Sequence, residues 1–294
     1  MKVTLYGVRG SIPTSSRETI KYGGHTACIF VEADNKLLVF DAGTGIRKLG
    51  NDIVNDDRDI HLFFSHYHWD HIQGFPFFKP AYQYGRNIHL LSAYLPEKNA
   101  KAVLDQMVNP HFPVPGDKIQ AKVRVMPMDV EGNLELGKIK VTTCALNHPG
   151  GGAAYRVETE QGTFAYVTDN ELYPPNEPNT SWEQWVDFLQ GVDLLIHDAM
   201  YLDEEQKSTH GWGHSLISQA IRLAKDAKVA NLVLFHHDPD RTDEQLEGIL
   251  QDCQSWVDEN DATYNVRLAK ETDVYHILNS TVQRKNKNQL INES

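Results

Sequence analysis

The stretch His66-Tyr67-His68-Trp69-Asp70-His71 places three histidines and one aspartate within six residues. Neutral imidazoles and a carboxylate are ligands that suit Zn²⁺, and also Mn²⁺ or Fe²⁺. Four ligand side chains so close in sequence cannot easily all reach one ion, so the spacing indicates two adjacent ions. The run before them, Ile60-His61-Leu62-Phe63-Phe64-Ser65, is mainly apolar and typical of a buried strand. We therefore predict a metal site at a strand end rather than a histidine-rich polar loop.

Three further ligand-type residues stand at the ends of strand patterns. His148, Asp169 and His236 each follow a run of strand-forming residues directly. Strand ends are where an α/β sheet places its reactive groups. One such residue alone is more often an ordinary residue beside a turn, but the three together with the first motif predict a single metal centre.

The composition is that of an ordinary globular protein. The chain has 294 residues, of which 40% are hydrophobic and 23% charged. A net charge of −12 argues against a broad nucleic-acid-binding surface, although a local basic groove stays open. Cys28, Cys144 and Cys253 have no paired spacing, so we expect buried reduced thiols. Neither a signal peptide nor a membrane helix is evident, so we expect a cytoplasmic protein with no membrane partner.

The hydrophobic pattern predicts one domain over residues 1–279 and a polar C-terminal tail over 280–294. Strands dominate the first half, whereas strands and helices alternate in the second, which favours an α/β sandwich of mixed sheets with outer helices. We expect strands at 2–7, 26–33, 37–41, 60–65, 88–91, 118–127, 138–146, 153–159, 163–168, 193–197, 231–235, 263–268 and 273–278, and helices near 70–76, 97–107, 181–189, 215–227 and 242–257.

The chain resembles the metallo-β-lactamase fold superfamily over residues 1–279. The stretch from His66 to His71 matches the superfamily's H-x-H-x-D-H motif, and the later ligand-type residues match its later motifs in order. The resemblance implies an αββα sandwich of two mixed sheets with outer helices, and two divalent ions per chain, with Zn²⁺ expected and Mn²⁺ or Fe²⁺ as alternatives. It implies that one ion is held by His66, His68 and His148, the other by Asp70, His71 and His236, and that Asp169 bridges them.

The roles of two further residues, His237 and Asp41, are open to alternatives. His237 could take the place of His236, but only one of two adjacent strand residues points inward, and motif order favours His236. Asp41 resembles a strand-end aspartate of the superfamily. It would either accept a hydrogen bond from a ligand imidazole or fix the turn Asp41-Ala42-Gly43-Thr44-Gly45.

Within the superfamily the chain looks most like the phosphodiesterase branch that includes tRNase Z. Residues 194–199 resemble the H-E-A-T element of that branch, with Asp198 in place of its Glu, and Gly213-His214-Ser215 resembles its H-S-T element. The tRNA-binding arm of tRNase Z lies between the third and fourth ligand motifs, where this chain has only 21 residues from His148 to Asp169. This short connection, together with the −12 charge, argues against tRNA as the substrate.

The resemblance is closer still to small bacterial cyclic-nucleotide-phosphodiesterase-like proteins. They share the motifs R-G-S-x-P, Y-G-G-x-T, D-A-G-T-G, H-W-D-H-I-Q-G-F-P-F-F and H-H-D-P, all of which are present here. We therefore expect a binuclear hydrolase that acts on small phosphodiesters such as cyclic nucleotides. The catalytic residues would be Asp70, His214 as the general acid, and Asp198 as the carboxylate that orients His214.

Other interpretations remain. A lactonase or thioesterase could use the same ions, and a tRNase Z-like endonuclease is a further alternative, whereas a scaffold protein would usually have lost ligands. The aromatic segments 75–78 and 109–113 either stack a base or are simply core and turn. The sequence leaves open the substrate, the metal, whether the chain forms a homodimer, and whether His25 or His111 contacts substrate.

Overall fold

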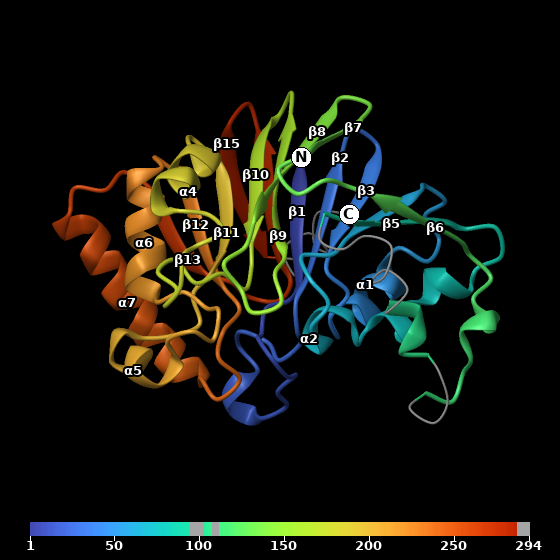
Figure 1. Ribbon diagram of the computed structural model, residues 1–294, viewed down its shortest axis with the longest axis horizontal. Coiled ribbons are helices and arrows are strands. Elements are labelled where there is room, and N and C mark those ends of the chain that lie inside the picture. Colours follow the sequence, from blue (N-terminus) through green and yellow to red (C-terminus); the bar gives the residue numbers. More distant parts are fainter. Residues whose placement is uncertain (94–102, 108–111, 287–294) are drawn as a thin grey trace.

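The computed structural model describes residues 1–93, 103–107 and 112–286 (Figure 1). Its strands are β1 (Lys2–Gly7), β2 (Cys28–Ala33), β3 (Lys36–Phe40), β4 (Ile60–Phe63), β5 (Asn87–Ser92), β6 (Lys122–Pro127), β7 (Asn133–Leu136), β8 (Ile139–Ala145), β9 (Ala153–Thr159), β10 (Gly162–Val167), β11 (Leu194–Asp198), β12 (Asn231–Phe235), β13 (Asn265–Leu268), β14 (Asp273–Leu278) and β15 (Thr281–Asn286). Its helices are α1 (Ile46–Asp52), α2 (Trp69–Ile72), α4 (Trp182–Leu189), α5 (Gln206–Thr209), α6 (Ile217–Asp226) and α7 (Asp243–Glu259), and its 3₁₀ turns are η1 (Arg17–Thr19), η2 (Phe75–Phe77), η3 (Lys79–Tyr82), η4 (Gly116–Lys118) and η5 (Asp203–Glu205).

The strands form two mixed sheets that pack against each other. The first sheet has the order β15-β14-β1-β2-β3-β4-β5-β6, and the second has the order β13-β12-β11-β10-β9-β8-β7. Strands β3 to β6 are parallel to one another, as are β10 to β13, while the remaining neighbours are antiparallel. Buried side chains from both sheets, such as Phe40, Phe63, Tyr155 and Phe164, fill the space between the sheets. The three cysteines are free and buried, as expected.

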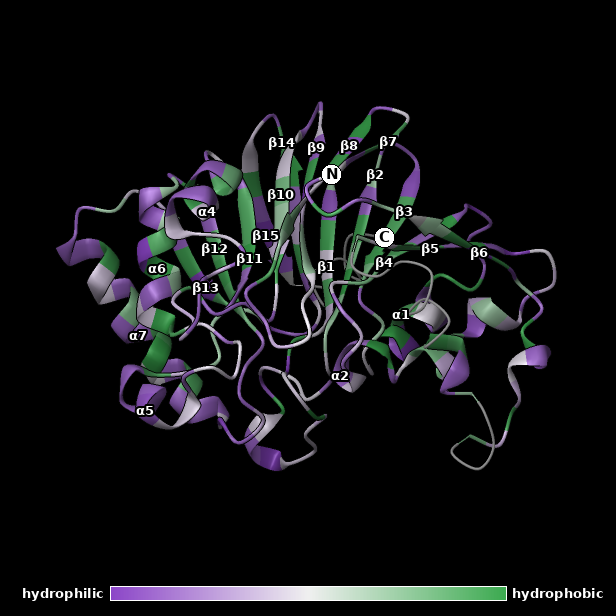
Figure 2. Ribbon diagram, viewed as in Figure 1, coloured by the Kyte–Doolittle hydropathy of each residue, from purple (hydrophilic) through white to green (hydrophobic). Residues whose placement is uncertain are grey.

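Helices cover the outer face of each sheet. Helices α4, α6 and α7 pack on the second sheet, and α1 packs on the first (Figures 1 and 2). In α7, Leu246, Ile249, Cys253 and Val257 are buried at intervals of three and four residues, so one apolar stripe faces the sheet. None of the described helices is long and apolar enough to cross a membrane. The four layers confirm the αββα sandwich.

The parallel strands place the candidate site residues at one edge of the sandwich. Phe40 pairs with Phe63 across β3 and β4, so Asp41 and the segment from Ser65 leave the first sheet side by side. Register likewise aligns the ends of β10, β11 and β12 in the second sheet. Asp41, Asp169 and His236, which follow β3, β10 and β12, have φ angles of 61°, 47° and 61°. This left-handed conformation turns the chain abruptly after each strand, and such strain is often found at functional sites.

The predicted polar tail begins too early. Residues 281–286 form β15, which pairs antiparallel with β14, so the prediction of an unpatterned tail from residue 280 is wrong for them. β15 is an edge strand with largely polar side chains, and it therefore lacks the apolar alternation by which a half-buried strand is recognised. Residues 287–294 lie outside the described residues.

Several other boundaries differ from the predictions. The strand expected at 118–127 begins at Lys122, because residues 116–118 form the turn η4. Of the helix expected at 97–107, residues 103–105 are helical, and residues 97–102 lie outside the described part of the chain. Helix α1 and strand β7 were not predicted, since both are short and carry several polar side chains.

Candidate metal centre and active site

The first group of donor atoms comes from three histidines and Asp169. Side-chain donors of His66, His68, His148 and Asp169 lie within 4.8 Å of one another. Nε2 of His148 is 3.0 Å from Nδ1 of His68, and Nε2 of His66 is 3.6 Å from Oδ2 of Asp169. His66 and His148 follow strands of different sheets, so the group bridges the two layers.

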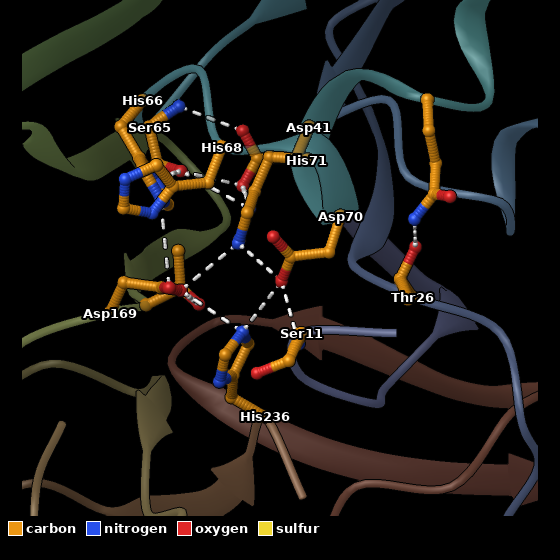
Figure 3. A network of polar contacts seen from close by, with 12 residues as sticks. Ser11, Thr26, Asp41, Ser65, His66, His68, Asp70, His71, Asp169 and His236 are labelled. Carbon is orange, nitrogen blue, oxygen red and sulfur yellow. Dashed lines mark hydrogen bonds and ion pairs between the residues drawn. The ribbon is translucent and has the colours of Figure 1, made fainter. Parts of the chain in front are cut away.

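The second group shares Asp169 with the first. Donor atoms of Asp70, His71, His236 and Asp169 also lie within 4.8 Å of one another (Figure 3). Nε2 of His71 is 3.1 Å from both Oδ2 of Asp70 and Oδ1 of Asp169, and Nε2 of His236 is 3.2 Å from the same two oxygens. The structure therefore brings together all seven ligand-type residues, with the two oxygens of Asp169 directed to different groups.

The donor set fits divalent cations. Ligands of a tetrahedral zinc site, with bonds of about 2.0–2.1 Å, lie about 3.3 Å apart, close to the separations above. Nε2 of His66 and Nε2 of His71 are buried and have no hydrogen-bond partner among the described residues. Although burial raises the pKa of Asp169, the imidazoles of His236, His71 and His66 hold it well below its usual value. Orphaned ring nitrogens beside buried, ionised carboxylates are the arrangement that a bound cation would satisfy.

Asp41 binds the ring nitrogen of His71 that does not take part in the second group. Its Oδ2 accepts hydrogen bonds from Nδ1 of His71 at 2.8 Å, from Oγ of Ser65 at 2.7 Å and from the hydroxyl of Tyr166 at 2.8 Å. Its Oδ1 accepts one from the backbone N–H of Ser65 at 2.8 Å. With its Nδ1 proton held by Asp41, His71 presents Nε2 to the donor group. Of the two roles considered for Asp41, the hydrogen bond to a ligand-type imidazole is present, and its other side-chain hydrogen bonds go to Ser65 and Tyr166 rather than to the turn at 42–45.

We expect Asp41→Asn to weaken the binding of one ion by about 10–100-fold, because an amide fixes the His71 imidazole less firmly than a carboxylate does. Competition with a chromogenic chelator measures this affinity. Tyr166→Phe is the matched control, since it removes one hydrogen bond to Asp41 and leaves the imidazole contact intact. Wild-type affinity in Asp41→Asn would restrict Asp41 to a structural role through its bonds to Ser65 and Tyr166.

Glu171 orders the segment before His214, a role that sequence reasoning missed. Its buried carboxylate accepts hydrogen bonds from the backbone N–H groups of Gly211 at 2.9 Å and Gly213 at 3.0 Å. The carbonyl of Gly213 in turn accepts a hydrogen bond from Nδ1 of His148 at 2.9 Å. A Cβ at Gly213, whose φ is 87°, would lie 2.2 Å from that ring nitrogen, so only glycine fits here. A glutamate two residues after Asp169 carries no motif that could have revealed this contact.

His214 and Asp198 form a dyad beside the donor groups. Nδ1 of His214 donates to Oδ2 of the fully buried Asp198 at 2.7 Å. The His214 ring stacks on that of His236 with centroids 5.0 Å apart. Burial lowers the pKa of His214, but the Asp198 carboxylate outweighs it and raises that pKa to about 9. Donor atoms of His214 and Asp198 also lie within 4.8 Å of donors from Asp169 and His236, so a ligand role for His214 needs its own test.

None of the other described candidates belongs to either donor group. His237 donates from Nε2 to the carbonyl of Ala269 at 2.8 Å, so His236 alone of the adjacent pair reaches the centre. Phe75 and Phe78 are fully buried in the core, while Phe77 is exposed. The backbone N–H of His25 bonds Glu271. Residues 109–111, including His111, lie outside the described part of the chain.

Residues 37–237 match the Beta-lactamase superfamily domain. Ribonuclease Z of Thermoplasma acidophilum is 22% identical over 320 aligned positions, which cover 93% of this chain and 99% of the relative. The metallo-beta-lactamase fold protein YhfI of Bacillus subtilis superposes with a TM-score of 0.68 at 20% identity, covering 93% and 98% of the two chains. The short form of human tRNase Z has a TM-score of 0.63 at 18% identity, covering 94% and 99%. The chain therefore belongs to the beta-lactamase superfamily, with the fold and the paired His/Asp donor groups of a metal-dependent hydrolase.

Proposed function

We propose that this protein is a phosphodiesterase in which two divalent ions are held by the seven donor residues. The observation that supports this most is the His214–Asp198 dyad at the edge of both donor groups. When bound, such ions lower the pKa of water toward neutrality and stabilise the charge that develops on a phosphoryl group. His214, whose pKa the Asp198 carboxylate acts to raise, would donate a proton to the leaving alkoxide. Asp198 would hold the Nδ1 proton and so leave Nε2 to act as the acid.

The names of the relatives favour RNA as the substrate. Full-length relatives from several organisms are named Ribonuclease Z, and this chain matches nearly the whole of the Thermoplasma acidophilum protein. The relatives therefore do not support the expectation that tRNA is an unlikely substrate. An overall charge of −12 excludes only a broad basic surface, not a local one.

A small phosphodiester is the second candidate, and one observation favours it. The alignment with the Thermoplasma acidophilum relative spans 320 positions, more than the 294 residues of this chain, so that relative carries segments that this chain lacks. The connection from His148 to Asp169 is also short, and β9 and β10 take up most of it as an antiparallel pair. A chain with no extended arm at this point suits a smaller substrate.

Metal-loaded protein should cleave a tRNA precursor at its 3′ trailer, with kcat/KM falling steeply between 50 and 200 mM salt because phosphate contacts release counterions. Parallel assays with a 3′,5′-cyclic nucleotide, a bis-aryl phosphate and a lactone separate the alternatives. Asp169→Ala protein prepared in the same way controls for contaminating nuclease.

Hydrolysis of the cyclic nucleotide without RNA cleavage would establish the second candidate instead. Activity on the lactone alone would overturn phosphodiester chemistry altogether.

A further inference from the structure

A second polar pocket lies outside the metal centre. It has a volume of about 320 Å³ and lies where α7, β13 and β15 meet the turn at Lys21. Four cationic side chains line it, namely Lys21, Arg267, Lys270 and Arg284, together with Glu247. They come from separate segments of the chain. The fold therefore brings cations together at this point although the net charge of the chain is −12.

The charges of this pocket are only partly compensated. Lys21 pairs with Glu247 at 2.6 Å, and Arg284 pairs with Asp273 at 2.7 Å. Arg267 and Lys270, by contrast, make no ion pair with any residue that the structure describes. Burial raises the pKa of Asp273, while Arg284, Lys270 and Arg267 all act to lower it, so the three cations surround that one carboxylate. Arg267 and Lys270 therefore have no ion pair of their own among the described residues, although Asp273 is near enough to both, and Glu247 to Lys270, to act on their charges.

The pocket is separate from the metal centre but adjoins it. None of its lining residues belongs to either donor group. Tyr22 forms part of its wall, and the Tyr22 ring contacts that of His237, the neighbour of His236, with centroids 5.9 Å apart. A ligand in the pocket would therefore occupy neither donor group and would not compete with a substrate for them.

We propose that this pocket binds a phosphate group through Arg267 and Lys270. Two cations that form no close ion pair match the charge of a phosphate dianion, and a guanidinium presents paired N–H donors that suit phosphate oxygens. The volume is ample for one or two phosphate groups. The phosphate would belong either to a small free anion or to the 5′ end of an oligonucleotide. The site does not depend on which substrate the metal centre hydrolyses.

Calorimetric titration of the metal-loaded protein with inorganic phosphate and pyrophosphate tests the proposal. The double variant Arg267→Gln/Lys270→Gln should lose one class of sites, or bind there at least tenfold more weakly, while the metal-dependent class remains. Lys122→Gln/Arg124→Gln is the matched control, because it removes the same charges from β6, at the opposite edge of the sheet from β15. Hydrolysis of an aryl diester should be unchanged in both variants.

Equal binding by the wild type and the Arg267/Lys270 variant would overturn the site, as would an equal loss in the control, which would point to overall charge. Thermal unfolding in phosphate-free buffer checks that the variant is folded, and the single variant Lys270→Gln provides a milder change.

Oligonucleotides with a 5′-phosphate or a 5′-hydroxyl then distinguish the source of the phosphate group. A preference for the 5′-phosphate that needs Arg267 and Lys270 assigns the pocket to nucleic acid, and pocket-dependent binding of pyrophosphate alone assigns it to a free anion.

Discussion

Asp169→Ala should lose both ions at once and lower turnover by roughly 10³ or more. The carboxylate contributes Oδ1 to one donor group and Oδ2 to the other, so its removal opens both. Residues that only support a ligand typically change metal affinity or activity by 10–100-fold, and a shared ligand should have a larger effect. Elemental analysis after reconstitution should find less than one ion per chain, against about two in the wild type.

Asp193→Ala is the matched control for this loss. Asp193 is also a buried carboxylate of the second sheet, but it lies at the other end of β10 and β11, where it accepts hydrogen bonds from the backbone and hydroxyl of Thr163. The Asp193→Ala substitution should lower the free energy of unfolding somewhat and leave the metal content unchanged. A folded Asp169→Ala protein that retains both ions would show that Asp169 does not bridge them.

His214→Ala should keep its metal while turnover falls by roughly 10²–10⁴ for substrates with an alkoxide leaving group. An alkoxide needs a proton in the transition state, whereas a nitrophenolate needs little, so the same variant should lose much less activity on an aryl diester. Asp198→Asn should show a milder form of this pattern, because the imidazole remains but its orientation and basicity change. Steady-state rates on matched alkyl and aryl diesters, with metal analysis of each variant, provide the measurement.

Two results would contradict this assignment. Equal losses on alkyl and aryl leaving groups would make His214 a phosphate-binding or structural residue. Loss of an ion in His214→Ala would make it a ligand, which the proximity of its donors to those of Asp169 and His236 permits.

The clustering of the seven ligand-type residues was predictable because they stand next to recognisable strands. His66, His148, Asp169 and His236 follow runs whose composition marks a strand, and parallel strands bring such ends to one edge of a sheet. Asp41 was predictable as a candidate, but its role was not, since choosing between an imidazole and a turn requires the position of His71.

Residues whose side chains bind backbone groups could not be recognised from the sequence pattern. Glu171 bonds two glycine N–H groups some 40 residues away, and an isolated glutamate does not indicate such a contact. The cations of the phosphate pocket are equally dispersed, because Lys21 and Arg284 lie near opposite ends of the chain. Strand β15 was missed for a different reason, since a polar edge strand pairs through its backbone rather than through an apolar face.

The number of ions bound per chain is the most direct test of the proposed mechanism. Protein purified without chelator, reconstituted with Zn²⁺ or Mn²⁺ and dialysed, should contain about two ions per chain by elemental analysis. One ion or none after reconstitution would contradict the binuclear centre, and with it the shared role of Asp169.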